Sequence, residues 1–425
     1  MASIVKRGNA YLITVCDGVD ANGKTVRKHM TFHPTETAPT KIQKEVQRAA
    51  SDFEKRVKSG AYYEGDRMSF RDLAEKWYQT YANQNISLSI REGYHRMLEN
   101  LIYPAIGTMP ITKIKPLNLQ EIYDGLLGKG RSASTIRNYH KVISSIFKAA
   151  YNWNLIEMNP CDRVVLPKIT QRYNYTIWSP EQVQLFFDAL KTEYTIKYKE
   201  RHRTDGSGNE YAVAAYDVNR SVSSMYIALY TLLLYTSARR GEVCALTWND
   251  VDFEAHEINI DKAVSNTHHG QIIKGTKTAA GTRRIYVQDQ VLDALRTWKE
   301  DQQELSLQLG SMWQGYSGDD YDMNYIFIQK DSGKMIYIDT IGQKFHDIIN
   351  AYNETAPKEK QLPVIRLHDL RHTGASLMIA NGVDFVTVSK RLGHAKPSTT
   401  LDIYSHALPS KDRAAADVLA SLISS

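Results

Sequence analysis

The sequence contains few cysteines and no long apolar run. Its three cysteines, Cys16, Cys161 and Cys244, are widely spaced and form no CxxC pair, which argues against a disulfide scaffold and against a zinc knuckle. The longest apolar run, 225–235, is far shorter than the ~18 residues that a membrane span needs, and two basic residues interrupt the only apolar start, so no signal peptide is predicted. We therefore expect a soluble cytoplasmic protein without a membrane partner.

The length and charge of the chain narrow its class further. At 425 residues it is too long for one core, and division by ~150 residues per domain suggests about three domains. Its 42% hydrophobic and 24% charged residues fit a folded protein. The net charge is +6, and residues 1–60 hold eleven Lys and Arg against six Asp and Glu. Such a basic segment suggests a polyanion partner, most often nucleic acid, although a solvated basic surface has the same composition.

Residues 1–62 are predicted to form a small β-β-β-α module. Polar and apolar side chains alternate over 24–32, directly after the hairpin-turn residues 20–23, and 38–58 has the composition of a helix. Residues 18–25 also match the phosphate-loop pattern GxxxxGK followed by Ser or Thr. A phosphate loop must open a helix, and these residues enter a strand, so we reject nucleotide binding. The DNA-binding candidates of this module are Lys24, Arg27 and Lys28.

Residues 66–167 are predicted to form a helical domain. It opens at Ser69-x-x-Asp72, a plausible capping sequence. Its clearest helix covers 134–151, where apolar residues occupy one side and a narrow basic stripe occupies the other. The stripe, which a helix lying along a DNA backbone would show, comprises Arg137, Lys141 and Lys148. A solvated lysine face is the alternative.

Residues 174–425 are predicted to form a mainly α-helical domain with a small antiparallel sheet. The sequence 179–182 (Ser-Pro-Glu-Gln) is a strong helix start, and the apolar run 225–235 is interpreted as a buried helix. Strand-like alternation occurs at 257–260 and 284–287. We interpret 195–222 as a polar surface insertion, and 409–425 as a C-terminal tail that could dock on a neighbouring subunit.

Four short motifs of this third domain combine polar groups with apolar surroundings. Arg239 and Glu242 lie three apart after the buried run and alone indicate a structural ion pair. Lys277 lies in 275–285, which we interpret as two strands joined by a short turn. The remaining candidates are His368 and Arg371 on one helical face, His394 after a glycine helix end, and Tyr404 in a helix that begins near residue 399.

The order and spacing of these motifs resemble those of the tyrosine recombinases, or phage-type integrases. The family patterns Thr-x-x-Arg-x-Gly-Glu, Lys-Thr, His-x-Leu-Arg-His-Thr and Leu-Gly-His, with Tyr-x-His following nine residues later, occur together. One departure is Ser237, where the family usually has glycine, and it questions the local backbone geometry. The resemblance covers the whole chain, so that 1–62 is similar to an arm-type DNA-binding domain, 66–167 to a core-binding domain and 174–425 to a catalytic domain.

The resemblance implies a transesterification on DNA. Tyr404 would be the nucleophile and would form a 3′-phosphotyrosyl link. Arg239 and Arg371 would bind the non-bridging phosphate oxygens through forked donors, and His368 and His394 would add hydrogen bonds and help to move the tyrosine proton. Glu242 would orient this set, and Lys277, preferred to Lys274 because it precedes Thr278, would protonate the leaving 5′-oxygen. His372 and His406 fit packing or supporting roles better. Neither ATP nor a metal nor any other cofactor is implied.

The favoured interpretation is an integrase that inserts or excises a mobile element or prophage. Its implied partners are double-stranded core and arm attachment sites, a homotetramer assembled on DNA, and possible accessory factors, namely an excisionase and a host DNA-bending protein. Three alternatives remain: a type IB topoisomerase, which uses similar chemistry as a monomer, a non-catalytic DNA-binding regulator, and a metal-dependent transposase, which is the least favoured.

Overall fold

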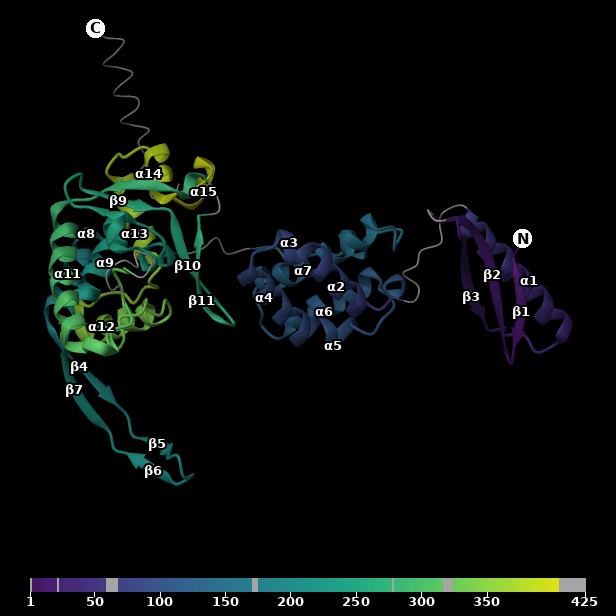
Figure 1. The fold of residues 1–425 in the computed structure, drawn as a ribbon, viewed down its shortest axis with the longest axis horizontal. Helices are drawn as coiled ribbons and strands as arrows, with labels where there is room; N and C mark the ends of the chain where they lie inside the picture. The colour runs from purple at the N-terminus through teal and green to yellow at the C-terminus, as the bar shows by residue number, and fades with distance from the viewer. Residues whose placement is uncertain are drawn as a thin grey trace, which may run out of the picture. The chain divides into compact units, whose positions relative to one another are not determined.

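The chain divides into two compact units, Met1–Arg172 and Tyr173–Ser425 (Figure 1). The computed structural model describes residues 2–20, 23–58, 68–169, 175–276, 279–315 and 324–404. The division after Arg172 lies beside the boundary expected between residues 167 and 174. The further boundary expected near residue 62 stays a prediction, because 59–67 lie outside the described residues. The tail 409–425 and the residue His406 also lie outside them.

The first described segment has the predicted β-β-β-α order. Its strands β1 (Ser3–Arg7), β2 (Ala10–Val19) and β3 (Thr25–Phe32) form an antiparallel sheet in the order β1-β2-β3, and α1 (Pro39–Lys58) follows. The sheet and the helix share a small core, which consists of Ile13, Val15, Ala50, Phe53 and Val57. Because Thr25 begins a strand and not a helix, the rejection of a phosphate loop at 18–25 is confirmed.

The second described segment is entirely helical. Its elements are α2 (Phe70–Trp77), η2 (Tyr78–Ala82), α3 (Asn83–Asn85), α4 (Leu88–Met97), η3 (Leu98–Ile102), α5 (Tyr103–Ile106), η4 (Ile111–Lys113), α6 (Pro116–Gly128), α7 (Ala133–Asn152) and η5 (Pro160–Arg163). The predicted cap of α2 is present, since the Asp72 amide donates to the Ser69 hydroxyl and the Asp72 carboxylate accepts from the Ser69 amide. The core is separate from that of the first segment and contains Phe70, Trp77, Tyr123 and Phe147.

Helix α7 has the predicted division into an apolar and a basic side. Its buried residues are Ile136, Val142, Ile143, Ile146, Phe147 and Ala150. Arg137, Lys141 and Lys148 are all exposed. The Arg137 guanidinium also donates to the Pro167 carbonyl oxygen at 3.2 Å. This arginine therefore has a structural contact that the two lysines do not share in the described structure.

The second unit is built around a buried helix. Its helices are α8 (Pro180–Lys191), α9 (Ser224–Thr236), α10 (Arg240–Cys244), α11 (Asp289–Leu309), α12 (Thr340–Thr355), α13 (Asp369–Ala380), α14 (Phe385–Leu392) and α15 (Pro397–Tyr404). Helix α9 is the predicted buried run, apolar on nearly every side, as a central core helix requires. The predicted start of α8 is confirmed, because Ser179 and Gln182 cap each other around Pro180. Short 3-10 turns, η6 (Trp248–Asp250), η7 (Ala279–Gly281), η8 (Gly310–Met312) and η10 (Lys358–Lys360), connect the elements.

Two small sheets lie at the edge of this helical body. Strands β8 (Val251–Asp252), β9 (Glu257–Ile260) and β12 (Arg283–Tyr286) form an antiparallel sheet in the order β12-β9-β8, and β10 (Lys262–Thr267) pairs with β11 (Gly270–Gly275) as a hairpin. The range 275–285, interpreted as two strands joined by a short turn, holds only the end of β11 and most of β12, and these two strands pair with different partners. The hairpin of β10 and β11 turns at 268–269. Gly270, which follows this turn, has a φ of 109°, a backbone conformation that favours glycine. Strand β12 pairs with β9 and not with β11.

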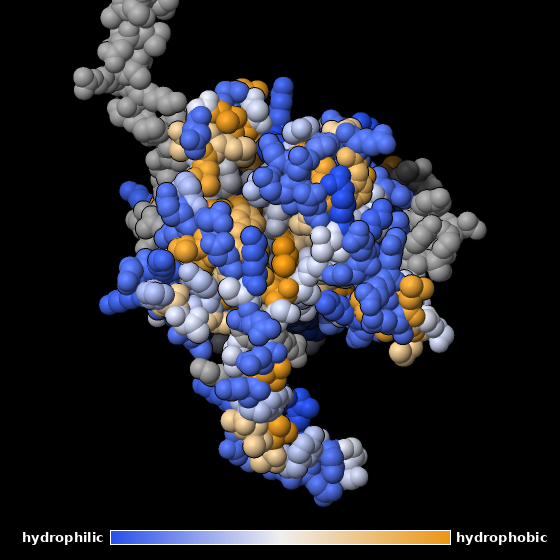
Figure 2. All heavy atoms as spheres, turned by 90° about the vertical axis from the view of Figure 1, so that its left-hand side faces the viewer, coloured by the Kyte–Doolittle hydropathy of each residue, from blue (hydrophilic) through white to orange (hydrophobic). Residues whose placement is uncertain are grey.

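The predicted polar insertion 195–222 forms a projecting arm. Strands β4 (Glu193–Tyr198) and β7 (Tyr216–Ser221) pair, and beyond them β5 (Arg201–Thr204) pairs with β6 (Glu210–Val213) (Figure 1). Figure 2 shows the end of the second unit that bears this arm, where hydrophilic residues cover most of the face and apolar residues are scattered among them. In the part of the chain that the structure describes, no helix has the length and apolarity to cross a membrane.

Candidate active site

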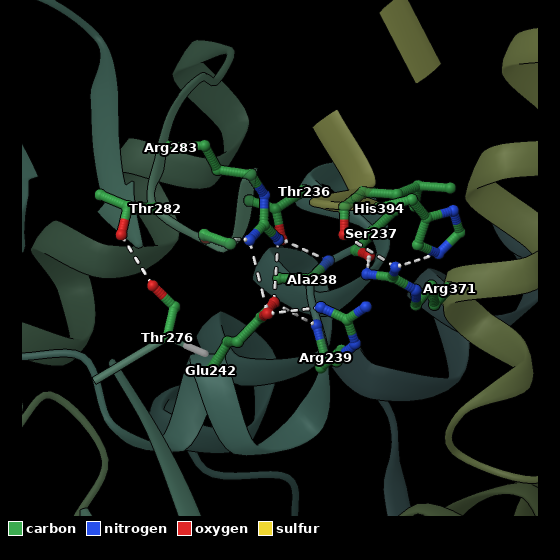
Figure 3. Close-up of polar contacts among 12 residues, drawn as sticks. Thr236, Ser237, Ala238, Arg239, Glu242, Thr276, Thr282, Arg283, Arg371 and His394 are labelled. Carbon is green, nitrogen blue, oxygen red and sulfur yellow. Dashed lines mark hydrogen bonds and ion pairs between the residues drawn. The ribbon is translucent and has the colours of Figure 1, made fainter. Parts of the chain in front are cut away.

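Three distant segments bring the predicted site residues together. Arg239 and Glu242 lie where α9 meets α10, Arg371 lies in the first turn of α13, and His394 follows α14. Figure 3 shows these side chains converging on one region of the second unit. Tyr404 is the last residue of α15, and His368 occupies the N-cap position of α13 without a side-chain capping hydrogen bond. Lys277 lies outside the described residues, so its place in the site stays a prediction.

Glu242 is a buried carboxylate that connects Arg239 to a second arginine, Arg283. Its Oε1 accepts from Arg239 Nη1 at 2.9 Å, and its Oε2 accepts from the Arg239 amide at 2.9 Å and from Arg283 Nη2 at 2.8 Å. Burial opposes ionisation, but the hydrogen bond and charge of Arg283, together with Arg239, outweigh it and lower the pKa of Glu242. The predicted orienting role is consistent with these contacts, because a saturated carboxylate holds Arg239 in place.

Sequence reasoning missed Arg283. Its side chain is only 7% exposed, whereas the next residue, Arg284, points to solvent at 74% exposure. Adjacent residues of a strand face opposite sides, so the sequence could indicate that one of the two arginines is inward. It could not indicate which one, because that depends on the pairing of β12 with β9.

Arg371 is almost completely buried and is held by three acceptors. Nη1 donates to the Ser237 carbonyl oxygen at 2.8 Å, and Nη2 donates to the Leu392 carbonyl oxygen at 2.8 Å and contacts His394 Nε2 at 2.9 Å. Burial lowers the pKa of Arg371 to about 10, so the guanidinium stays charged at neutral pH. These contacts engage three of its five N–H groups.

The contacts of His394 fix its protonation state. A guanidinium can only donate, so His394 Nε2 must be the acceptor and the ring proton of the neutral imidazole lies on Nδ1. Nδ1 then donates to Thr400 Oγ1 at 2.8 Å. Burial and the positive charge of Arg371 lower the pKa of His394 to about 4, in agreement with a neutral ring.

Ser237 adopts the backbone conformation of the position where the family usually has glycine. It ends α9 with φ 51° and ψ 27°, the left-handed conformation that glycine adopts most readily. Its carbonyl oxygen is thereby presented to Arg371. A Cβ on Gly374 would overlap the Ser237 hydroxyl and would lie 2.9 Å from the Leu234 carbonyl oxygen. The serine is therefore accommodated because its neighbour in α13 has no side chain.

The proposed nucleophile is buried against a histidine that the sequence assigned to a supporting role. Tyr404 is 1% exposed, and its hydroxyl lies 2.8 Å from His372 Nδ1. The Tyr175 ring packs on His372 with centroids 3.9 Å apart. Burial raises the pKa of Tyr404 to about 12 and lowers that of His372 to about 4. In this state the phenol is protonated and its hydroxyl is bound to His372, while both ring nitrogens of His394 are engaged elsewhere.

A cavity of about 440 Å³ opens beside these groups. The lining residues that matter for the chemistry are Arg239, Glu242, Lys274, Thr276, His394 and Thr399. The hydroxyl of Thr276 bonds that of Thr282 at 2.7 Å, which connects the end of β11 to the start of β12 (Figure 3). Among the described residues no group of three His, Cys, Asp or Glu side chains has the arrangement of a metal site.

The DNA-binding candidates of the N-terminal module do not share one face of its sheet. Lys28 pairs with the buried Val15 and lies on the face that α1 covers. Arg27 lies on the opposite face, paired with Cys16, and is exposed, as is Lys24 in the turn before β3. Of these three candidates, Arg27 is therefore the strand residue that lies on the open face of the sheet.

Comparison with known proteins finds two family patterns in the sequence. The pattern described as "Phage integrase family" matches residues 211–411, and that described as "Phage integrase, N-terminal SAM-like domain" matches residues 69–127. Together they match more than half of the chain. The ICEBs1 integrase of Bacillus subtilis (strain 168) is 28% identical over 313 residues, which are 74% of this chain and 72% of that protein.

Two solved structures share the fold. The Tn1549 transposon integrase in complex with transposon right end DNA superposes with a TM-score of 0.64 at 22% identity, over 83% of this chain and 100% of that one. A lambda integrase tetramer bound to a Holliday junction matches with a TM-score of 0.51 at 13% identity, over 93% of this chain and 94% of that one. At these identities the likeness concerns the fold.

Proposed function

Because the chain belongs to the phage integrase family and is a tyrosine recombinase, we propose that it cuts and rejoins DNA through Tyr404 at the site described above. Its function is site-specific recombination that integrates or excises a mobile element. The observation that carries the residue assignment is that separate segments place Arg239 on Glu242, His394 on Arg371, and Tyr404 on His372 of the helix that also holds Arg371.

The proposed reaction exchanges one phosphodiester for another. The Tyr404 oxygen attacks the scissile phosphorus, a 3′-phosphotyrosyl bond forms, and the bond to the 5′-oxygen breaks. Arg239 and the free N–H groups of Arg371 stabilise the charge that develops on the non-bridging oxygens, and His368 and His394 assist with hydrogen bonds and with the tyrosine proton. Lys277 gives a proton to the departing 5′-oxygen. Since one ester replaces another, the bond energy is conserved, and we propose that neither ATP nor a metal ion takes part.

Two geometric conditions precede this reaction. Tyr404 must leave His372, because a hydroxyl buried at 1% exposure cannot reach a DNA phosphate. A phosphate must also gain access to the remaining N–H groups of the Arg371 guanidinium, because this residue is 3% exposed. We propose that DNA binding meets both conditions, so the DNA-free state described here is the resting state.

The assembly follows from counting nucleophiles. Recombination between two duplexes cuts four strands, and each chain supplies one Tyr404, so we propose a homotetramer on core and arm attachment sites. The solved lambda integrase assembly is a tetramer on a Holliday junction, which supports this stoichiometry. An excisionase and a host DNA-bending protein are proposed accessory factors.

Covalent trapping tests the nucleophile. A duplex of the joined element ends, nicked beside the cleavage position, should trap the wild-type chain as an adduct that survives a denaturing gel. Tyr404→Phe should bind this duplex with unchanged affinity and form no adduct, because only the hydroxyl is lost. His406→Phe serves as the matched control and should form adduct.

The same experiment separates the alternatives. A wild-type chain that binds the duplex without any adduct would identify a non-catalytic regulator. Adduct formation followed only by relaxation of supercoiled plasmid, without strand joining between two sites, would identify a type IB topoisomerase. Adduct from the Tyr404→Phe variant would show that another residue attacks, and sequencing of the cross-linked peptide would name it.

A further inference from the structure

Lys274 carries a buried ammonium for which the described residues supply no hydrogen-bond partner. It lies in β11 and lines the cavity beside Arg239 and His394. Its Nζ is buried and has no hydrogen-bond partner among the described residues. The proposed reaction uses Lys277 as the proton donor and gives Lys274 no role.

The strand register explains why Lys274 faces the cavity. Lys274 pairs with Ala263 of β10, and cross-strand partners point to the same face of a hairpin. Ala263 and Ser265 line the same cavity, whereas Val264 between them is buried in the core. The alternation of the strand therefore directs Lys274 toward the site, and the small side chain of Ala263 leaves space in front of it.

The hairpin is also fixed against the site arginine. A Cβ on Gly241 would lie 2.5 Å from the Val264 carbonyl oxygen, so α10 approaches β10 as closely as only glycine permits. Arg239 caps this helix. The position of Lys274 relative to Arg239 is thus set by backbone packing, not by flexible loops.

The charges around the cavity leave the Lys274 ammonium uncompensated. The one carboxylate among the lining residues is Glu242, and its two oxygens already accept from Arg239 and Arg283. A buried charge without a counterion destabilises a folded protein unless a ligand supplies the opposite charge. Lys262 on the neighbouring strand shows the ordinary solution, since its ammonium bonds Asp250 Oδ2 at 2.6 Å.

We propose that Lys274 is a phosphate-binding residue of the active site, whose ammonium pairs with a backbone phosphate of the bound DNA inside this cavity. The inference rests on the proposed function, because a DNA phosphate is the anion that the reaction brings to Arg239. Lys274 acts as a positioning cation, distinct from the proton donor proposed at Lys277.

Replacing Lys274 by methionine, whose side chain has a similar length, should slow cleavage without lowering the stability of the protein. Lys274→Met should form adduct on the nicked duplex at least tenfold more slowly than wild type. The log–log salt dependence of its DNA binding should become shallower by about 0.9, the contribution of one phosphate contact. Its thermal midpoint should be equal to or above that of wild type, because an unpaired buried charge has been removed. Lys262→Met, the matched control, should lower the midpoint, because it leaves the buried Asp250 carboxylate without its counterion and with only the Thr247 amide and hydroxyl as donors.

Each other outcome overturns the proposal. Adduct formation within twofold of wild type would show that Lys274 does not contact the phosphate, and a lowered thermal midpoint would show that it is structural. A duplex with sulfur at the bridging 5′-position, whose thiolate leaves without a proton, should rescue Lys277→Ala and not Lys274→Met. Rescue of Lys274→Met would make Lys274 the proton donor instead. If the wild-type chain formed no adduct, the proposed function itself would be wrong, and this outcome is distinct from a failure of the Lys274 proposal alone.

Discussion

At the scale of single residues, most groups of the site are already hydrogen-bonded to one another. Glu242 is saturated by two arginines, and the neutral His394 connects Arg371 to Thr400. Such a network holds the proposed phosphate-binding groups in place before DNA arrives, so that the proposed reaction needs less reorganisation when charge develops on the phosphate. Tyr404 is the exception, since its contact with His372 must be broken before it can react.

The buried histidines make stability depend on pH. Burial lowers the pKa of His372 to about 4 in the folded state, whereas an unfolded histidine titrates near ~6.5. The unfolded state therefore binds more protons, so the contribution of His372 is complete above pH ~6.5 and is lost as the pH falls toward ~4. We expect the free energy of unfolding to decrease across this window, with His372 contributing on the order of 2 kcal/mol.

Urea unfolding at a series of pH values measures this dependence. His372→Phe should have a smaller loss of stability between pH 6.5 and 4, because it removes one of the titrating groups. His394, whose pKa is also lowered to about 4, should account for part of the remaining loss. The assignment would be wrong if the substitution left the slope unchanged. Glu242 acts only at lower pH, since its pKa lies below that of an ordinary carboxyl.

At the scale of elements, local sequence patterns predicted the helices well and the strand pairings poorly. The caps at Ser69 and Ser179 and the two faces of α7 depend on residues within a few positions of each other. The pairing of β12 with β9, and of β10 with β11, depends on residues far along the chain or on a turn at 268–269 that has no strong two-residue signal. That pairing decides which residue of Arg283 and Arg284, and which face of β11, points inward.

Because packing between distant segments cannot be predicted from local patterns, the sequence predicts some features of the site and not others. Family spacing predicts site roles for Arg239, His368, Arg371, His394 and Tyr404 because it depends only on positions along the chain. It could not show that His372 bonds the tyrosine or that Lys274 lies in the cavity without a hydrogen-bond partner among the described residues, because both facts arise from packing between α13, α15 and the hairpin.

Helix α7 offers an element-scale prediction about DNA contact. Lys141→Ala with Lys148→Ala should weaken binding by a similar factor on every duplex and should reduce the log–log salt slope by about 1.8, the contribution of two phosphate contacts. The thermal midpoint should not change, because both side chains are exposed. Arg137→Ala should lower the midpoint as well, because it removes the hydrogen bond to the Pro167 carbonyl oxygen. Fluorescence anisotropy on a core site and on an unrelated duplex measures the binding. Unchanged binding by the lysine pair would assign the stripe to solvation.

At the scale of the whole molecule, the N-terminal module, the helical segment and the second unit each have hydrophobic cores of their own, which suggests separable tasks. The N-terminal module packs around Phe53, the helical segment around residues such as Trp77, and the second unit around α9. No described residue of the N-terminal module belongs to the core of either other part. A protein assembled in this way can bind one stretch of DNA with the module and cut another with the second unit.

Removal of the N-terminal module tests this division. A chain that begins at Met68 should still form adduct on the nicked core duplex, because Arg239, Arg371, His394 and Tyr404 all lie in the second unit. It should lose integration between full attachment sites, because the module no longer tethers arm DNA.

Residues 1–62 alone should bind duplex DNA, and their affinity should fall steeply with salt, by about 0.9 in log–log slope for each phosphate contacted. Arg27→Ala should weaken this binding more than Lys28→Ala, since Arg27 lies on the open face of the sheet and Lys28 on the face that α1 covers. Salt-insensitive binding, or integration by the shortened chain at the wild-type rate, would show that the module is not a DNA tether.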